Sequence, residues 1–220
     1  MDLMFRENIS RDMWNWREAM SISGYGIDWK QFLPESFSSD AVRDENRLRS
    51  YLEQQYYLPG KVSEFKSWME QHINAEEIAA DLETLMGRAF TPGPITVFLT
   101  TFHRAPYDVS GRFFYSIIRS YKREVSITSV YHELMHFLFH WHYWETCRSA
   151  GLSDTQIHVL KESLTVLLNP ILDRRGLPHD NGYPSHQAFR TIWATTWLEN
   201  RTFVSFLETA LRRYASMVAQ

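Results

Sequence analysis

Residues 132–136 read His132-Glu133-Leu134-Met135-His136, an HExxH pattern in the middle of a long segment that contains neither proline nor glycine. The neighbouring residues 129–138 are apolar, aromatic or uncharged apart from the motif itself. This composition predicts a buried helix that begins at Thr128 or earlier and ends before Gly151. Because residues four apart lie one turn apart on one helical face, His132 and His136 should project side by side.

Two imidazoles at this spacing can bind one tetrahedral zinc ion. Glu133 follows the first histidine and can act as the general base on a metal-bound water. The motif therefore predicts a zinc-dependent hydrolase. The alternative is a structural helix whose histidines satisfy neighbouring carbonyls while Glu133 faces water.

A zinc site of this kind needs a third protein ligand. His140 lies about 12 Å beyond His132 along the axis, at roughly 1.5 Å per residue, so a straight helix cannot bring both to one ion. A return helix capped by Ser153 offers Glu162 instead. The chain travels roughly 17 Å from His136 to the turn and roughly 14 Å back, which brings Glu162 level with His136. On the same estimate, other return-helix candidates fall short of that level, namely Asp154 and His158.

The return helix has two distinct faces. Its apolar face consists of Ile157, Leu160, Leu164, Leu167 and Leu168, and its polar face of His158, Glu162, Thr165 and Asn169. A single carboxylate among neutral polar side chains favours a metal ligand. The alternative is an exposed Glu162 beside Lys161, of little energetic consequence.

The spacing resembles that of the gluzincin clan of zinc metallopeptidases. In that clan the two histidines and a downstream helical glutamate bind zinc, and the motif glutamate activates water. The resemblance rests on four residues within 95–170, with Glu162 at 162 − 136 = 26 positions beyond the second histidine. It implies Zn²⁺ held by His132, His136 and Glu162, with Glu133 as the catalytic base. Phe139 stands where the metzincin clan has a glycine, which excludes that clan.

The chain departs from the gluzincin pattern four residues after the third ligand. Many gluzincins carry an acidic residue there that holds a zinc-bound histidine, and this chain has Val166. Asn169, Asp173 or a backbone carbonyl would then hold the histidine, or else the third ligand is another residue.

Two segments before the motif read as strands. Residues 95–102 alternate β-branched and apolar residues after a Pro-Gly-Pro break, and residues 113–118 follow Val109-Ser110-Gly111. The resemblance implies a zincin-like catalytic core with a small β-sheet beside the HExxH helix. It also implies that an edge strand pairs with an extended peptide or protein substrate.

A tyrosine or histidine commonly shares the negative charge that develops in such a reaction. Tyr183 and His186, in the turn-rich loop 179–186, are the candidates for this catalytic role. The alternative is that Tyr183 packs on the loop and Ser185 caps the next helix.

The rest of the chain reads as helical, which predicts an α+β protein that is mostly helical, with helical N-terminal and C-terminal regions. The predicted division is a helical region over residues 1–90 and a catalytic region over residues 91–220. Before the strands, helices are expected over 10–20, 39–56, a segment from Val62 and 75–86. After the catalytic core they are expected over 185–199 and 202–218.

The net charge of −3 and pI near 6.3 give no electrostatic reason to expect nucleic acid or an anionic membrane as a partner. No apolar run reaches the roughly 18 residues of a transmembrane helix. The single cysteine, Cys147, excludes an internal disulfide and fits a cytoplasmic protein. We expect it to be structural. Trp141, Tyr143 and Trp144 either pack between helices or line a hydrophobic substrate subsite.

These patterns predict a cytoplasmic, gluzincin-like zinc peptidase whose oligomeric state does not follow from the sequence. Two alternatives stay open. One is a zincin-like regulatory or binding module without general proteolysis, and the other is a metal-free helical protein.

Overall fold

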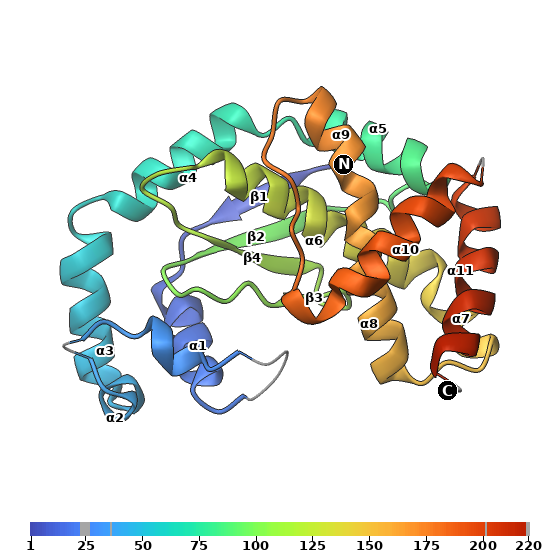
Figure 1. The fold of residues 1–220 in the computed structure, drawn as a ribbon. Coiled ribbons are helices and arrows are strands. Elements are labelled where there is room, and N and C mark those ends of the chain that lie inside the picture. Colours follow the sequence, from blue (N-terminus) through green and yellow to red (C-terminus); the bar gives the residue numbers. More distant parts are fainter. Residues whose placement is uncertain (23–26, 36, 201, 219–220) are drawn as a thin grey trace. The chain divides into compact units, whose positions relative to one another are not determined.

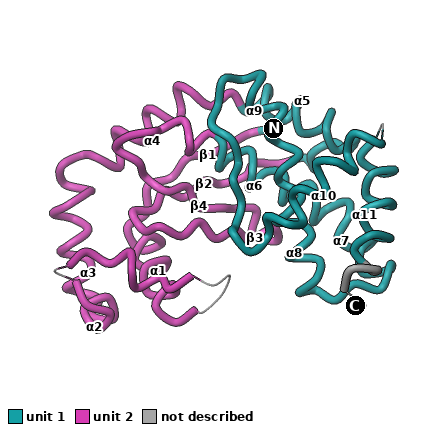
Figure 2. Tube along the Cα trace, viewed as in Figure 1, with its two compact units in different colours: residues 1, 75–92, 128–220 teal, residues 2–74, 93–127 magenta. Residues whose placement is uncertain are grey.

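The computed structural model describes residues 1–22, 27–35, 37–200 and 202–218, with side chains described up to Tyr214. The chain forms two compact units (Figure 2). Unit 1 contains residues 1, 75–92 and 128–220, and unit 2 contains residues 2–74 and 93–127. This grouping differs from the predicted division after residue 90, because residues 93–127 pair with the N-terminal segment in one sheet.

Unit 2 is built on a four-stranded mixed sheet with the order β1-β2-β4-β3 (Figure 1). The strands are β1 (Leu3–Arg6), β2 (Ile95–Thr100), β3 (Tyr107–Asp108) and β4 (Phe113–Ile117). β1 and β4 both run parallel to β2, and the two-residue β3 is antiparallel to β4. The two strands read from the sequence are thus confirmed, and with them an α+β fold that is mostly helical. The zincin-like arrangement of the core stays a prediction.

β1 was not expected, because the N-terminal ninety residues read as helical. The strand has four residues, among which only Phe5 is buried, so it carries no alternation that a sequence pattern could reveal. β2 also ends earlier than the expected residue 102. The amide of Thr101 donates to Asp12 at 3.0 Å instead of continuing the strand ladder.

In its described residues, unit 2 contains four whole α-helices, of which the first three contribute residues to a buried apolar cluster. They are α1 (Ile9–Ala19), α2 (Ser39–Arg43), α3 (Glu45–Leu52) and α4 (Lys61–His72), joined by a 3₁₀ turn (Trp29–Phe32) and a π-helical turn (Glu53–Tyr57). The buried cluster comprises Met13, Trp16, Ala19, Phe37, Ala41, Val42, Leu48, Leu52 and Phe102. α1 contacts β2 and α4 contacts β1.

The single helix expected over residues 39–56 is wrong, because the chain breaks at Asp44. The Asp44 carboxylate accepts a hydrogen bond from the amide of Arg47 at 3.1 Å and so starts α3 as its N-cap. A second cap, Ser38, starts α2 by accepting from the amide of Ala41. Side chains of this type compete with the helix interior for backbone amides, which favours two short helices over one long helix.

A buried polar network joins α1 to the end of β2. The carboxylate of Asp12 accepts hydrogen bonds from the hydroxyls of Thr100 and Thr101 at 2.7 and 2.8 Å. Thr101 Oγ1 in turn accepts from the indole N–H of Trp16 at 2.9 Å. Asp12 is fully buried, and burial raises its pKa to about 6 despite these donors. The network therefore fixes α1 on the sheet. Removal of the Thr101 hydroxyl would take a hydrogen-bond partner from both Asp12 and Trp16.

Replacing Thr101 by valine is expected to lower the free energy of unfolding by about 2–6 kcal/mol, since it removes a buried hydrogen-bond partner from both Trp16 and Asp12 and each such loss costs about 1–3 kcal/mol. Thr101→Ser is the matched control, because it keeps the hydroxyl and loses only a methyl group, worth about 0.8 kcal/mol. Urea denaturation of the three proteins measures the difference. Equal midpoints for Thr101→Val and Thr101→Ser would show that the hydroxyl contributes nothing.

Unit 1 is helical in its described residues. Its elements are α5 (Ala75–Met86), α6 (Glu124–His142), α7 (Trp144–Ser149), α8 (Asp154–Leu164), a 3₁₀ turn (Thr165–Leu168), α9 (Asn169–Arg174), a 3₁₀ turn (Pro184–His186), α10 (Gln187–Leu198) and α11 (Phe203–Val218). The first four residues of α6 belong to unit 2 by their contacts. α10 contacts α8 and α11, and α11 contacts α5. The predicted apolar stripe of α11 is buried, namely Phe203, Phe206, Leu207, Ala210 and Tyr214.

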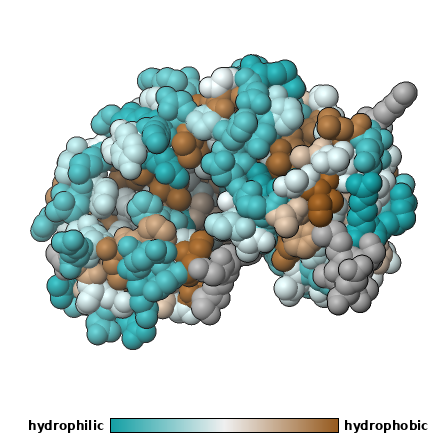
Figure 3. Space-filling view, viewed as in Figure 1, coloured by the Kyte–Doolittle hydropathy of each residue, from teal (hydrophilic) through white to brown (hydrophobic). Residues whose placement is uncertain are grey.

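The visible face in Figure 3 is covered largely by hydrophilic residues, with hydrophobic residues in separate smaller areas. Among the described residues, no helix combines the length and the apolar character needed to span a membrane.

Candidate metal centre

The middle of α6 carries the HExxH motif and is held within unit 1 by side-chain hydrogen bonds. Thr128 Oγ1 donates to the carbonyl of Pro178 at 2.8 Å, and the Tyr131 hydroxyl donates to Asp81 of α5 at 2.9 Å. His136 is 1 % exposed and Glu133 is 7 % exposed. The alternative in which Glu133 faces water is therefore wrong.

α6 stops sooner than expected, at His142, and a short helix α7 follows. The break falls at Tyr143, whose backbone leaves the helical region although no proline or glycine is present. The Tyr143 ring is buried against Phe203, and its hydroxyl donates to the carbonyl of Met86. We attribute the break to these tertiary contacts of one side chain, which have no signature in the local sequence.

The return helix α8 begins as predicted. Ser153 accepts a hydrogen bond from the amide of Gln156, and the Gln156 side chain accepts one from the amide of Ser153, which completes a capping box. The predicted apolar face of this segment is buried throughout. Glu162, in the last turn of α8, is also buried, at 5 % exposure, so the alternative of a solvent-exposed glutamate is wrong.

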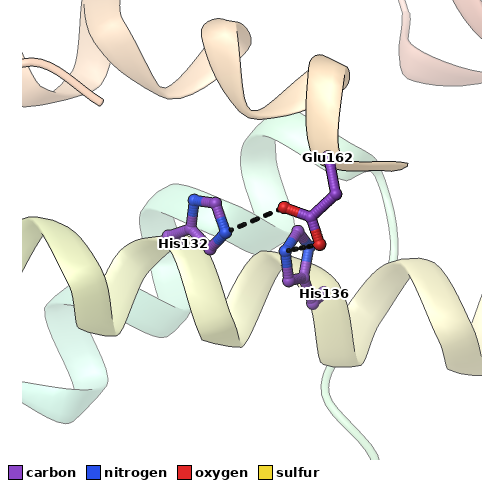
Figure 4. A group of neighbouring side chains, drawn as sticks. All are labelled: His132, His136 and Glu162. Atoms are coloured by element: carbon purple, nitrogen blue, oxygen red, sulfur yellow. Dashed lines mark ion pairs between the residues drawn. The ribbon is translucent and has the colours of Figure 1, made fainter. Parts of the chain in front are cut away.

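His132, His136 and Glu162 meet as predicted (Figure 4). The two histidines project from α6 toward the carboxylate of Glu162, which enters from α8. His132 Nε2 lies 3.4 Å from Glu162 Oε2, and His136 Nε2 lies 3.2 Å from Glu162 Oε1. One ligand atom from each residue lies within 4.8 Å of the others. The three side chains could therefore hold one metal ion.

These separations are of the size expected between the ligands of one small metal ion, for which tetrahedral zinc gives a reference value. Two ligand atoms that each lie about 2.0–2.1 Å from an ion at the tetrahedral angle are separated by about 3.3–3.4 Å. The two nitrogen–oxygen distances, 3.4 Å to Oε2 and 3.2 Å to Oε1, are close to this value, although they reach different oxygens of Glu162. Two imidazoles and one carboxylate are also the protein ligands of some catalytic zinc sites, in which water or substrate would take the fourth place.

The ionisation of His136 and Glu162 suits metal binding, which requires neutral imidazole and ionised carboxylate, whereas His132 has to release a proton to bind a metal ion. Burial lowers the pKa of His136 to about 3, with the charge of Lys161 adding to the effect. Burial alone would raise the pKa of Glu162, but His136 and Lys161 hold it well below its usual range. Burial also opposes the charged form of His132, yet the Asp180 carboxylate raises its pKa well above the ordinary value.

Glu133 contributes a second buried carboxylate to the centre. Its Oε2 is buried and has no hydrogen-bond partner among the described residues. Burial raises the pKa of Glu133 to about 7, and the charges of His132 and Glu162 act on it in opposite directions. A desolvated carboxylate with a pKa near neutrality and an unused oxygen is suited to accept and return a proton.

Asp180 holds His132, and sequence reasoning missed this residue. Its Oδ2 lies 2.7 Å from His132 Nδ1, which leaves Nε2 of the ring facing Glu162. Burial would raise the pKa of Asp180, but His132 and then Arg190 lower it to about 2. A carboxylate on the far nitrogen of a metal-binding histidine fixes the ring orientation and increases its basicity.

The sequence offered Asn169 and Asp173 as residues that could hold the histidine, and Asn169 contributes only indirectly, by binding Asp180. Asn169 accepts a hydrogen bond from the amide of Asp180 at 2.9 Å and donates to its carbonyl at 3.3 Å. Asp173 instead pairs with His179 on the surface, at 2.6 Å, with 65 % of its side chain exposed. The expectation for Asp173 is therefore wrong.

Asp180 is itself held by a buried arginine and a threonine. Arg190 on α10 donates to Thr165 Oγ1 at 2.6 Å and lies 3.0 Å from Asp180 Oδ1. Thr165, three residues after Glu162, donates to Asp180 Oδ1 at 2.8 Å. Gly182 has φ +58°, and a Cβ there would lie 2.6 Å from the Arg190 guanidinium. The sequence signal for this support was the Asp180-Asn181-Gly182 turn beyond Glu162, the candidate third ligand.

Tyr183 and His186 lie together, with ring centroids 5.6 Å apart in an edge-to-face arrangement. His186 is buried and its Nδ1 has no hydrogen-bond partner among the described residues. Burial lowers the pKa of His186, and the charge of Glu162 opposes that shift, so the ring feels the charge of the triad. The cap of α10 is His186 and not Ser185. A catalytic role for Tyr183 and His186 stays a prediction.

The residues after the motif are mainly packing residues. Trp141 packs on Phe137, at 5.4 Å between ring centroids, and Cys147 is fully buried, with its pKa raised by burial to about 12. Trp144 differs, since it stacks on His140 at 4.3 Å and meets His158 at 4.9 Å. His140 and His158 lie one turn along their helices from His136 and Glu162, outside the triad.

No family model, curated protein or solved structure matches this chain, so the functional argument rests on the residues of the candidate metal centre.

Proposed function

We propose that this protein is a zinc-dependent hydrolase that cleaves peptide bonds, with His132, His136 and Glu162 as the zinc ligands. The observation that carries the proposal is the meeting of these side chains, with His136 and His132 at 3.2 and 3.4 Å from the Glu162 carboxylate. The buried carboxylate of Glu133 beside them supports catalysis over a purely structural metal site.

Zinc bound at this triad would polarise a carbonyl oxygen and lower the pKa of a bound water. The residues of the chain supply the remaining functions. Glu133 Oε2 accepts the proton of the attacking water and returns it to the leaving amine, and Asp180 keeps His132 in the tautomer whose Nε2 faces the site. The burial of Glu133 and Asp180 excludes bulk water from their carboxylates.

The choice of a peptide substrate follows the resemblance to gluzincins rather than any contact in the site. The direct test incubates the zinc-loaded protein with a mixture of peptides of varied sequence and identifies new termini by mass spectrometry. Chelator-sensitive cleavage is the expected result. A protein that holds one zinc ion but cleaves neither these peptides nor a co-purifying partner would contradict the peptidase and favour the regulatory or binding module.

Asp180→Asn is expected to weaken zinc binding by about 10–100-fold, the usual effect of removing a partner of a metal-binding histidine. The amide is nearly the same size but carries no charge to stabilise the His132 N–H. Competition with a coloured chelator measures the dissociation constant. Asp173→Asn is the matched control, because that carboxylate lies on the surface and pairs only with His179. An equal affinity of the Asp180→Asn and Asp173→Asn proteins would remove Asp180 from the centre.

A further inference from the structure

Lys161 is the one buried lysine in the described part of the chain, at 1 % exposure. Lysine side chains are almost never fully buried unless they are paired, because an ammonium ion is costly to remove from water. One partner here is Glu162 Oε1, at 2.7 Å from Lys161 Nζ. A lysine adjacent in sequence to the third candidate ligand therefore belongs to the centre itself rather than to the surface.

The contact makes the two oxygens of Glu162 unequal. Oε1 lies between the Lys161 ammonium at 2.7 Å and His136 Nε2 at 3.2 Å. Oε2 lies 3.4 Å from His132 Nε2. A carboxylate oxygen that already accepts a hydrogen bond from an ammonium group is a weaker ligand for a second cation. The other oxygen of the carboxylate is then the better ligand.

We propose that Lys161 is a positioning residue that reserves Glu162 Oε1, so that Glu162 offers the metal ion Oε2 alone. This inference rests on the proposed function, because it concerns the third ligand of the same site. Its consequence is the coordination number. One oxygen from Glu162 and two imidazole nitrogens leave the fourth place of a tetrahedron open, whereas a carboxylate that binds through both oxygens occupies an additional place.

The rival explanation is that Lys161 only compensates the charge of a buried glutamate. Both explanations predict that removal of the ammonium changes stability, since breaking a buried ion pair leaves an uncompensated charge. They differ in what happens to a bound metal ion. Only a positioning role predicts a change in how Glu162 coordinates the ion, so the decisive readout is spectroscopic rather than a measurement of stability or activity.

Cobalt(II) reports this difference, because geometry around a transition metal governs its visible absorption and four-coordinate cobalt absorbs more strongly than five-coordinate cobalt. The wild-type protein is expected to give the strong four-coordinate band. Lys161→Met, which keeps a similar length without the ammonium, is expected to lose roughly half or more of that absorptivity per bound cobalt ion as Oε1 joins the coordination. Leu160→Met is the matched control, since it changes the packing of the same buried helix segment and leaves the ion pair intact.

Identical cobalt spectra for wild type and Lys161→Met would overturn the inference, and so would a five-coordinate spectrum of the wild type itself, which needs no variant to fold. Failure of the proposed function gives a different result. In that case the wild-type protein binds no stoichiometric cobalt or zinc, whereas failure of the inference alone leaves one metal ion per chain with an unchanged spectrum.

Discussion

Glu133→Gln is expected to retain its metal ion and to lose hydrolysis by about 10²–10⁴-fold, the usual contribution of a positioned general base. Glutamine has nearly the same shape as glutamate but cannot accept the proton of the attacking water. Glu133 is 7 % exposed and its Oε2 has no hydrogen-bond partner among the described residues, so the substitution breaks no hydrogen bond of that oxygen. The effect should therefore fall on turnover rather than on folding.

The measurement is the rate of peptide cleavage together with metal content, for wild type, Glu133→Gln and Glu124→Gln. Glu124 is an exposed glutamate in the first turn of the same helix, and its substitution is expected to change neither quantity. Undiminished turnover in the Glu133→Gln protein, with metal content unchanged, would exclude Glu133 as the base.

Removal of the metal ion is expected to lower the melting temperature by about 10 °C. A ligand at a thousand times its dissociation constant stabilises the folded state by about 4.1 kcal/mol, and in a chain of this size each kcal/mol corresponds to about 2–4 °C. The physical reason is specific to this centre. The buried carboxylates of Glu162 and Asp180 face the imidazoles of His136 and His132. Water does not stabilise the negative charges of these carboxylates, so a bound cation stabilises them instead.

The measurement compares the melting temperature of the protein treated with a chelator with that of the same protein after zinc is restored. His136→Ala should melt at the same temperature with and without zinc, because a ligand of the ion is missing. His72→Ala on α4 is the control and should respond to zinc like the wild type, since His72 lies on an exposed helix face. A zinc response that persists in His136→Ala would mean that the stabilising ion binds elsewhere.

The candidate metal centre was predictable because its main determinants are local. Four-residue spacing places His132 and His136 on one helical face, and a capped return helix of known rise brings Glu162 level with them. The distance estimate held although α6 ends at His142, because the chain continues in α7 before it turns back. The buried apolar face of α8 then orients Glu162 toward α6.

The residues that support the triad were not predictable in the same way. Asp180 reaches His132 through a loop, and the position of that loop depends on Arg190, which lies on another helix. The burial of Lys161 was not predicted, because it depends on the tertiary packing of α8 rather than on the neighbours of Lys161 in sequence. Such contacts join residues through tertiary structure, and no periodic pattern records them.

The sheet also contains strands that no local sequence pattern predicts. The alternation in residues 95–102 identified β2, which ends at Thr100, and the buried residues Ile95, Val97 and Leu99 follow that alternation. β1 and β3 have four and two residues, too few for a periodic signal, and their existence depends on pairing with β2 and β4. Short strands at the margins of a sheet are defined by the neighbour that they pair with.

The central claim is that His132, His136 and Glu162 bind one zinc ion, and elemental analysis of identically purified wild type and Glu162→Ala tests it most directly. We expect about one zinc ion per wild-type chain and a clear loss in the variant. Full zinc in both proteins would contradict Glu162 as the third ligand. Absence of zinc from the wild type, even after zinc is supplied and the excess removed, would contradict the metal centre and with it the proposed hydrolase.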